Sequence, residues 1–235
     1  YVADVSVYEQ SFITAFQLYF GDPSGYCMLA LLPSYLEREG SSLVYMMDAL
    51  IRASGHRDSG FYLDEHERLM DLLMSLKKSG QKTILLGVSF ALMELAEKYP
   101  EDLSGITLIE TGGMKGRRKE MIKEELHRFL CEGFKLEKIH SEYGMTELLS
   151  QAWSMGDGIF SCPPWMKISI RDPYDPFTFL PAGKSGIVCI TDLANRYSCS
   201  FIATSDLGRL HEDGRFEILG RMDHSDIRGC NLLVQ

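Results

Sequence analysis

Short apolar runs alternate with amphipathic segments along residues 1–140, and this alternation leaves few folds open. Residues 26–32 and Thr83–Val88 are nearly continuously apolar, which is typical of strands that are buried on both faces. The segments between them carry apolar residues at helical spacing, as Leu69 and Leu76 illustrate. The pattern therefore predicts an α/β fold with a mainly parallel sheet flanked by helices.

Capping and punctuation residues set the boundaries of the expected elements. Asp4, Ser41 and Ser89 are suited to helix N-caps, whereas Gly21 and Pro100 are suited to helix ends. We therefore expect helices over residues 5–20, 41–51, 64–78, 89–99 and 117–131, and strands over 26–32, 83–88, 106–109 and 136–140. Residues 141–147 are expected to begin a further helix.

From about Trp165 the pattern changes to short β-rich segments separated by Pro, Gly and Asp-Gly signals. Strands are expected over residues 167–171, 185–192, 200–205 and 215–219, with Asp213-Gly214 in a hairpin turn. We therefore expect two domains. Residues 1–164 would form an α/β domain, and residues 165–235 a smaller β-rich subdomain.

Charge and composition exclude several classes of protein. The chain has 24 Lys+Arg against 33 Asp+Glu, a net charge of −9, which argues against a nucleic-acid partner. Its one basic run, residues 115–119, is explained equally well by an anion and by a solvated face. No apolar stretch approaches the ~20 residues needed to cross a bilayer, and no export signal opens the chain. Because the cysteines also lack any Cys-x-x-Cys pair, we expect a cytoplasmic protein with reduced thiols.

The segment 141–147 brings an aromatic ring, a glycine, a hydroxyl and a carboxylate together in one short run. The ring of Tyr143 could stack on a purine, and Gly144 allows backbone and ligand to approach closely. Thr146 could donate to a phosphate oxygen near a helix N-terminus, and Glu147 could hold Mg²⁺ against that phosphate. The alternative is a capped helix with Tyr143 in the core.

Two further polar groups stand near the end of the chain. Asp206 follows a predicted strand and could accept hydrogen bonds from both hydroxyls of a ribose. Arg221 follows the predicted hairpin and could reach the ribose or a phosphate from the other side. Each of these two signals for a nucleotide site is weak alone. The order in which they follow segment 141–147 is a stronger signal.

That order resembles the adenylate-forming superfamily of acyl-CoA synthetases, peptide-synthetase adenylation domains and firefly luciferase. The matching motifs are Tyr-Gly-x-Thr-Glu at 143–147, Asp-x-Gly at 206–208, Gly-Arg-x-Asp at 220–223 and the Gly112-Gly113 turn. More narrowly, residues 110–117, 140–150 and 228–231 are similar to acyl-protein synthetases of the LuxE type, which are long-chain fatty acid ligases. The resemblance spans nearly the whole chain and implies the fold of the large N-terminal domain of adenylate-forming enzymes. It also implies that residues 1–164 bind nucleotide and acyl group and that residues 165–235 complete the nucleotide site.

The resemblance also implies a role for each matching residue. Gly112, Gly113 and Tyr143 would bind adenine, Asp206 would hold the ribose hydroxyls, and Arg221 the ribose-phosphate side. Thr146 would contact the α-phosphate or the substrate carboxylate, and Glu147 would hold the magnesium. Gly144, in the same motif, is counted with the nucleotide-binding residues. The implied enzyme is an acid–thiol ligase that uses ATP and Mg²⁺ to convert a carboxylic acid, in the LuxE type a fatty acid, into an acyl-adenylate.

In the LuxE type the acyl group then passes to a cysteine near the C-terminus, and Cys230 stands in the matching place. A thiolate is a good acyl acceptor, and an acyl reductase or an acyl carrier thiol could collect the group from the thioester. The alternative for Cys230 is a small buried apolar residue, which is what most free cysteines are. Its acceptor role is therefore an open expectation.

Two departures from the superfamily pattern accompany the match. Nothing in residues 1–25 supplies the Ser/Thr/Gly-rich loop that wraps the β- and γ-phosphates in the superfamily, so we expect the sequence to be a fragment. The chain also ends twelve residues after Asp223, without the mobile C-terminal domain of the larger members, as LuxE-type proteins do. The competing interpretation is a non-enzymatic subunit that keeps the nucleotide fold to bind an acyl reductase or acyl carrier partner.

Overall fold

The computed structural model describes residues 2–33, 40–63, 65–112 and 121–222. The helices are α1 (Val5–Phe20), α2 (Ser42–Ser54), α3 (His66–Ser79), α4 (Ser89–Lys98) and α5 (Lys123–Phe134). The strands are β1 (Cys27–Leu31), β2 (Gly60–Phe61), β3 (Thr83–Val88), β4 (Thr107–Thr111), β5 (His140–Tyr143), β6 (Ala152–Ser154), β7 (Ile159–Ser161), β8 (Met166–Arg171), β9 (Phe179–Leu180), β10 (Ser185–Asp192), β11 (Phe201–Leu210) and β12 (Phe216–Arg221).

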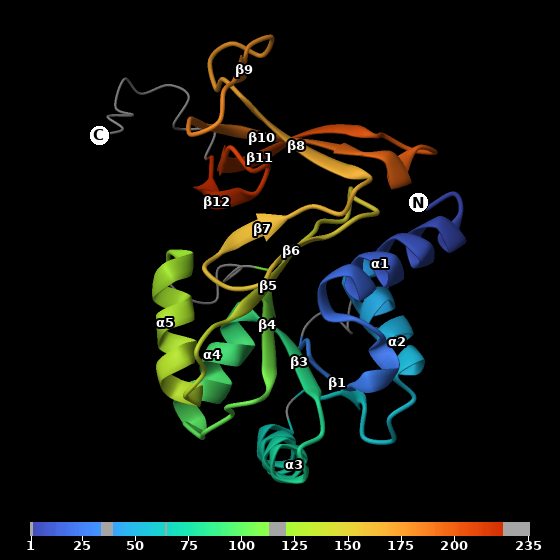
Figure 1. The fold of residues 1–235 in the computed structure, drawn as a ribbon, viewed down its shortest axis with the longest axis vertical. Helices are drawn as coiled ribbons and strands as arrows, with labels where there is room; N and C mark the ends of the chain where they lie inside the picture. The colour runs from blue at the N-terminus through green and yellow to red at the C-terminus, as the bar shows by residue number, and fades with distance from the viewer. Residues whose placement is uncertain (1, 34–39, 64, 113–120, 223–235) are drawn as a thin grey trace.

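In the described residues the strands form one sheet in the order β2-β1-β3-β4-β5-β6-β7-β12-β11-β10-β8-β9 (Figure 1). The pairs from β2 to β5 are parallel. Every pair from β5 onward is antiparallel. The fold predicted from the sequence, a mainly parallel sheet with helices followed by a smaller β-rich part, is confirmed.

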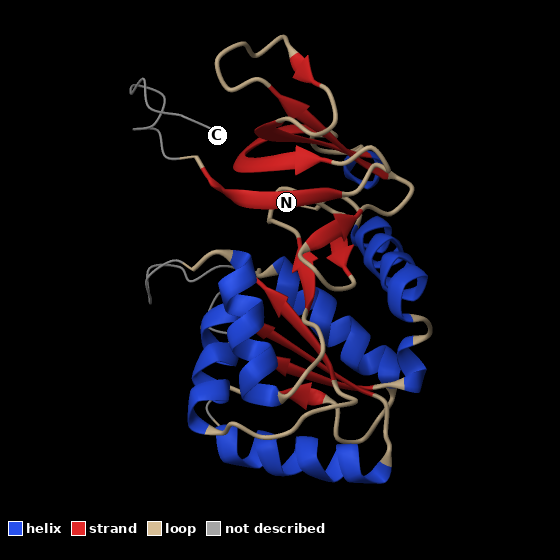
Figure 2. Ribbon diagram, turned by 60° about the vertical axis from the view of Figure 1, so that its left-hand side comes forward, coloured by secondary structure: helices blue, strands red, loops and turns tan. Residues whose placement is uncertain are grey.

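Helices cover both faces of the parallel strands, as Figure 1 shows with α4 and α5 on one side and α1 and α2 on the other. Figure 2 shows that the helices gather around this half, while the antiparallel strands extend beyond it. The parallel strands are buried on both faces because crossover helices pack there, which explains the continuous apolar run of β3. None of the described helices has both the length and the apolar character to span a bilayer.

The buried apolar side chains form two clusters. The larger one contains side chains from the five helices α1 through α5 and from the parallel strands. It includes Phe12, Leu85 and Trp153, each fully buried. The smaller one lies in the antiparallel half around Phe160 and Phe216, which are also fully buried. The expected division into residues 1–164 and 165–235 stays a prediction.

Several helix boundaries follow the capping logic of the sequence. Asp4 caps α1, where its carboxylate accepts from the Ser6 amide at 3.0 Å, and Ser41 caps α2. Gly80 ends α3 in the left-handed region, at φ +71°. The expected start of α5 at residue 117 lies outside the described residues, and the described helix begins at Lys123.

Three predictions of local structure are wrong. Ser89 does not cap α4, because Val88 holds the N-cap position and the Ser89 hydroxyl is bonded elsewhere. Residues 141–147 do not begin a helix. The strand lies at His140–Tyr143 rather than at 136–140, and the chain then turns and returns as the antiparallel β6. The pairing of β5 with both β4 and β6 therefore overrides the local helix signal.

Candidate functional site

Three of the residues singled out in the sequence meet between the two halves of the sheet. Tyr143 ends β5, Asp206 lies in β11, and Arg221 ends β12. The Tyr143 hydroxyl donates to Asp206 Oδ2 at 2.7 Å, and Arg221 Nε lies 3.6 Å from Asp206 Oδ1. Asp206 and Arg221 are also register partners across the β11–β12 pair. The fold thus brings together three groups that are far apart in the sequence.

The Tyr143 ring is held by an aromatic cluster. Its centroid lies 5.8 Å from that of Phe160 and 5.7 Å from that of Phe216, and these two rings stack at 5.4 Å. Burial, with the Asp206 carboxylate beside it, raises the pKa of the Tyr143 phenol well above its ordinary value. The phenol is therefore protonated at neutral pH and acts as a donor to Asp206.

Asp206 and Arg221 differ greatly in exposure. The Asp206 side chain is 16% exposed, whereas that of Arg221 is 80% exposed, so their ion pair contributes little to stability. An exposed guanidinium beside a half-buried carboxylate can donate to a ligand phosphate while the carboxylate accepts from ligand hydroxyls. The pair is thus chemically suited to a ribose-phosphate group.

Gly112 follows β4 at φ +70°, a left-handed conformation that favours glycine. It is exposed, and its carbonyl oxygen accepts from the Ser89 hydroxyl at 3.0 Å. Gly113, the other expected adenine contact, lies outside the described residues, as does Cys230. The roles expected for Gly112, Gly113 and Cys230 stay predictions.

Thr146 and Glu147 lie in the turn between β5 and β6, and both are exposed. The expected helix N-terminus at Thr146 is absent, so the dipole argument for a phosphate at this residue is wrong. The turn is fixed from the other half of the chain, because Asn195 Nδ2 donates to the Glu147 carbonyl at 2.7 Å. In the described part of the chain no group of three or more His, Cys, Asp or Glu side chains is arranged to hold a metal ion.

Gly144 is needed for a close contact within the protein. A Cβ atom at this position would clash with Glu142 Oε1 and lie 3.3 Å from Gln151 Cγ. The absence of a side chain therefore makes room for a buried carboxyl group, and not only for a ligand as the sequence suggested. The use of Gly144 in binding stays a prediction.

We expect Gly144→Ala to destabilise the fold by about 1–3 kcal/mol, because the added methyl group overpacks a buried site. The urea denaturation midpoint at pH 7 measures this effect. Gly25→Ala is the matched control, since a Cβ there meets nothing within 4 Å. Equal midpoints for the two variants would show that Glu142 moves aside at no cost.

Sequence reasoning missed a buried polar network behind Gly112. Glu110 in β4 is 1% exposed, and its Oε1 lies 2.5 Å from Lys123 Nζ and 3.4 Å from His127 Nε2, both on α5. Ser89 donates to Glu110 Oε2 at 3.0 Å, and the Ser141 hydroxyl lies 3.2 Å from His127 Nε2. Burial opposes ionisation of Glu110, but Lys123 and His127 outweigh it and lower its pKa to about 2. The signal available in the sequence was the position of Glu110, an acidic residue directly after the apolar strand expected over residues 106–109.

Glu142 is a second buried carboxyl group, on the opposite face of the sheet. Thr111 and Glu142 are register partners, as are Glu110 and Ser141, so the two acids point to opposite sides. Thr111 Oγ1 donates to Glu142 Oε2. Burial raises the pKa of Glu142 to about 7, with a smaller contribution from the charge of Glu110.

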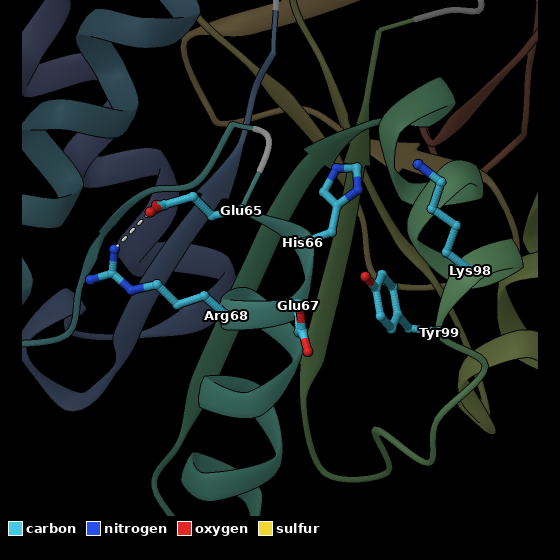
Figure 3. A pocket seen from close by; sticks show the side chains of 6 residues that line it. All are labelled: Glu65, His66, Glu67, Arg68, Lys98 and Tyr99. Atoms are coloured by element: carbon cyan, nitrogen blue, oxygen red, sulfur yellow. Dashed lines mark hydrogen bonds and ion pairs between the residues drawn. The ribbon is translucent and has the colours of Figure 1, made fainter.

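An open hollow of about 400 Å³ lies elsewhere, between the start of α3 and the end of α4 (Figure 3). Its lining includes the Glu65–Arg68 ion pair, Lys98 and Tyr99. Ser89 and Lys98 are at opposite ends of α4, and a helix rises ~1.5 Å per residue. The hollow is therefore remote from Gly112, and none of the predicted site residues lines it.

Neither a protein-family model nor a curated protein matches the sequence. Solved structures do match. ATP-bound MatB from Rhodopseudomonas palustris superposes with a TM-score of 0.66 at 18% identity, over 92% of this chain and 44% of that chain. The luciferase-like enzyme from the nonluminescent mealworm Zophobas morio gives 0.61 at 16%, over 93% and 53%. McyG A-PCP in complex with phenylalanyl-adenylate gives 0.62 at 19%, over 92% and 43%.

These similarities establish the fold. The chain has the fold found in the large N-terminal domains of adenylate-forming enzymes, which agrees with the expectation from the motifs. It spans about half the length of the structures that it matches. The narrower resemblance to the LuxE type stays a prediction.

Proposed function

We propose that the protein uses ATP to activate a carboxylic acid as its acyl-adenylate. The observation that carries the proposal is the convergence of Tyr143, Asp206 and Arg221, three residues that the motif resemblance had assigned to the nucleotide. Similar structures include one bound to ATP and one bound to an aminoacyl-adenylate, which supports this chemistry.

In the proposed reaction a carboxylate oxygen of the acid attacks the α-phosphorus of ATP. A new phosphorus–oxygen bond forms, and the bond from the α-phosphorus to the bridging oxygen breaks and releases pyrophosphate. Asp206 binds the ribose hydroxyls and Arg221 the phosphate side, while Tyr143 and Gly112 flank the adenine. The protein acts mainly by positioning and by neutralising charge.

Magnesium fits the residues present. Mg²⁺ usually takes one or two protein carboxylates together with substrate phosphates, and the exposed Glu147 carboxylate lies on the turn directly after Tyr143. In the proposal Glu147 holds the ion and Thr146 donates to the α-phosphate or the acid. When bound, Mg²⁺ neutralises negative charge on the phosphates.

The finer part of the proposal concerns the acid and its acceptor. The resemblance to the LuxE type favours a fatty acid and transfer of the acyl group to a thiol, with Cys230 as the candidate acceptor and an acyl reductase or acyl carrier as partner. Transfer to Cys230 would form a thioester and release AMP. A hydroxylamine-sensitive adduct that mass spectrometry detects in the wild type, and not in Cys230→Ser, would support this step.

ATP–pyrophosphate exchange in the full-length protein tests the proposal. We expect exchange that depends on an added carboxylic acid and on Mg²⁺, with fatty acids of several chain lengths as the first substrates. Glu147→Gln should raise the Mg²⁺ concentration needed for half-maximal exchange, because a neutral amide binds the cation less well than a carboxylate. Asp157→Asn, on the β6–β7 turn at the other end of β6, is the matched control and should leave that concentration unchanged.

The alternative, a non-enzymatic subunit that keeps the nucleotide fold, predicts a different result. Such a protein would show no exchange with any acid, even when full length. Unchanged magnesium dependence in Glu147→Gln would remove Glu147 from the site but leave acyl activation in place.

A further inference from the structure

The buried ion pair of Glu110 and Lys123 lies directly behind the proposed adenine side of the site. Glu110 is on β4, two residues before Gly112, and Lys123 is in the first turn of α5. The Lys123 side chain is 27% exposed and its ammonium group lies 2.5 Å from a carboxylate that is 1% exposed. The network therefore joins β4, the strand that leads into Gly112, to α5 in the flanking layer.

One branch of the network leads to Gly112. The Ser89 hydroxyl lies 3.0 Å from Glu110 Oε2 and 3.0 Å from the Gly112 carbonyl oxygen. A hydroxyl has a single proton to donate, so these two acceptors share it. The position of the Glu110 carboxylate thus determines how firmly the Gly112 backbone is held.

The other branch leads to Tyr143. Lys123 Nζ lies 4.9 Å from the centroid of the Phe160 ring, a cation–π distance, and Phe160 packs against Tyr143. The stem of Lys123 also lies close to Gly158, where a Cβ atom would meet its Cδ at 3.3 Å. A single ammonium group therefore contacts both the carboxylate behind Gly112 and the ring beneath Tyr143.

We propose that Glu110 and Lys123 are positioning residues for the adenine end of the nucleotide site, holding Gly112 on one side and the Phe160–Tyr143 pair on the other. The inference rests on the proposed function. A buried ion pair adds little stability compared with well-packed apolar side chains, but it fixes the distance between two elements. Its effect is therefore expected in the affinity for ATP, and neither residue needs to touch the ligand.

The test compares ATP affinity with stability in the full-length protein. Titration calorimetry gives the Kd for ATP, exchange kinetics give KM and kcat, and urea denaturation gives stability. Lys123→Met should raise the Kd and KM for ATP about tenfold with little change in kcat, because the interaction is lost equally in the ground and transition states. Lys123→Arg keeps the charge and the cation–π contact and should bind ATP nearly as the wild type does.

The double variant Glu110→Gln with Lys123→Met separates positioning from simple stability. It contains no unpaired buried charge, so we expect its stability to recover toward the wild-type value while the Kd for ATP stays raised. Lys77→Met is the matched control, because it removes a lysine ion pair outside the proposed site. Lys77, on α3, has its Nζ 2.7 Å from Asp102 Oδ1 and 2.7 Å from the Asp102 carbonyl oxygen. It should lose stability without any change in Kd.

The outcomes separate this inference from the function on which it rests. A wild-type Kd in the double variant would overturn the positioning role and leave acyl activation untouched. A wild-type protein that binds no ATP would overturn the proposed function and the inference together. Should Lys123→Met fail to fold, the double variant and Ser89→Ala, which frees the Gly112 carbonyl, decide the question by the same Kd measurement.

Discussion

Replacing Asp206 with alanine is expected to weaken ATP binding by at least about a hundredfold. In the proposed site its carboxylate accepts from both ribose hydroxyls, and hydrogen bonds to a charged group are each worth about 1.5–3 kcal/mol. Two of them amount to about 3 kcal/mol or more, which corresponds to about a factor of a hundred in Kd. Titration calorimetry with ATP on the full-length protein measures the change.

Two controls define what this loss means. Asp213→Ala removes the same charge from the same strand pair, at the hairpin turn where Asp213 bonds to Arg215, and should leave the Kd unchanged. Tyr143→Phe removes the 2.7 Å donor to Asp206 but keeps the ring, and we expect a several-fold loss. An Asp206→Ala protein that is folded and binds ATP within threefold of wild type would rule out Asp206 as the ribose ligand.

Much of the parallel half of the fold could be predicted from local signals, although the short β2 was missed and β5 was placed too early in the chain. Strand β3 is buried at every position, so its apolar run marks its ends, and Asp4 and Gly21 mark the ends of α1. These features depend on residues that are neighbours in the sequence, where hydrophobic period and capping chemistry act.

The β5–β6 turn and the polar networks could not be predicted in the same way. Strand β6 has only three residues, too few for a periodic pattern, and it is defined by its pairing with β5. The Tyr143–Asp206 hydrogen bond and the Glu110–Lys123 ion pair depend on how distant elements pack. Motif order indicated that Tyr143 and Asp206 share a site, but the resemblance assigned no role to Glu110 or Lys123.

Replacing Glu142 with glutamine is expected to stabilise the folded protein at pH 8 by about 3 kcal/mol and to change little at pH 4.5. Burial raises the pKa of Glu142 from 4.5 to about 7 in the folded state. The folded state therefore holds this proton more tightly than the unfolded state does. The stability that this proton contributes is present below pH 4.5 and is lost as the pH rises toward 7, at ~1.4 kcal/mol per pKa unit. Glutamine stays neutral throughout and can still accept from Thr111.

Urea denaturation of wild type and Glu142→Gln between pH 4.5 and pH 8 tests this prediction, and Glu110→Gln supplies a comparison of opposite sign. Since the pKa of Glu110 is lowered to about 2, its stabilising effect is present above its ordinary pKa of 4.5 and is lost as the pH falls toward 2. Glu110→Gln should therefore destabilise the protein at pH 8, where Glu142→Gln stabilises it.

The opposite signs would follow from the different surroundings of the two acids. Lys123 and His127 lie against Glu110, whereas the Thr111 hydroxyl donates to the buried Glu142. Parallel stability curves for wild type and Glu142→Gln would contradict this account, because they would show that Glu142 titrates as an exposed carboxyl group does.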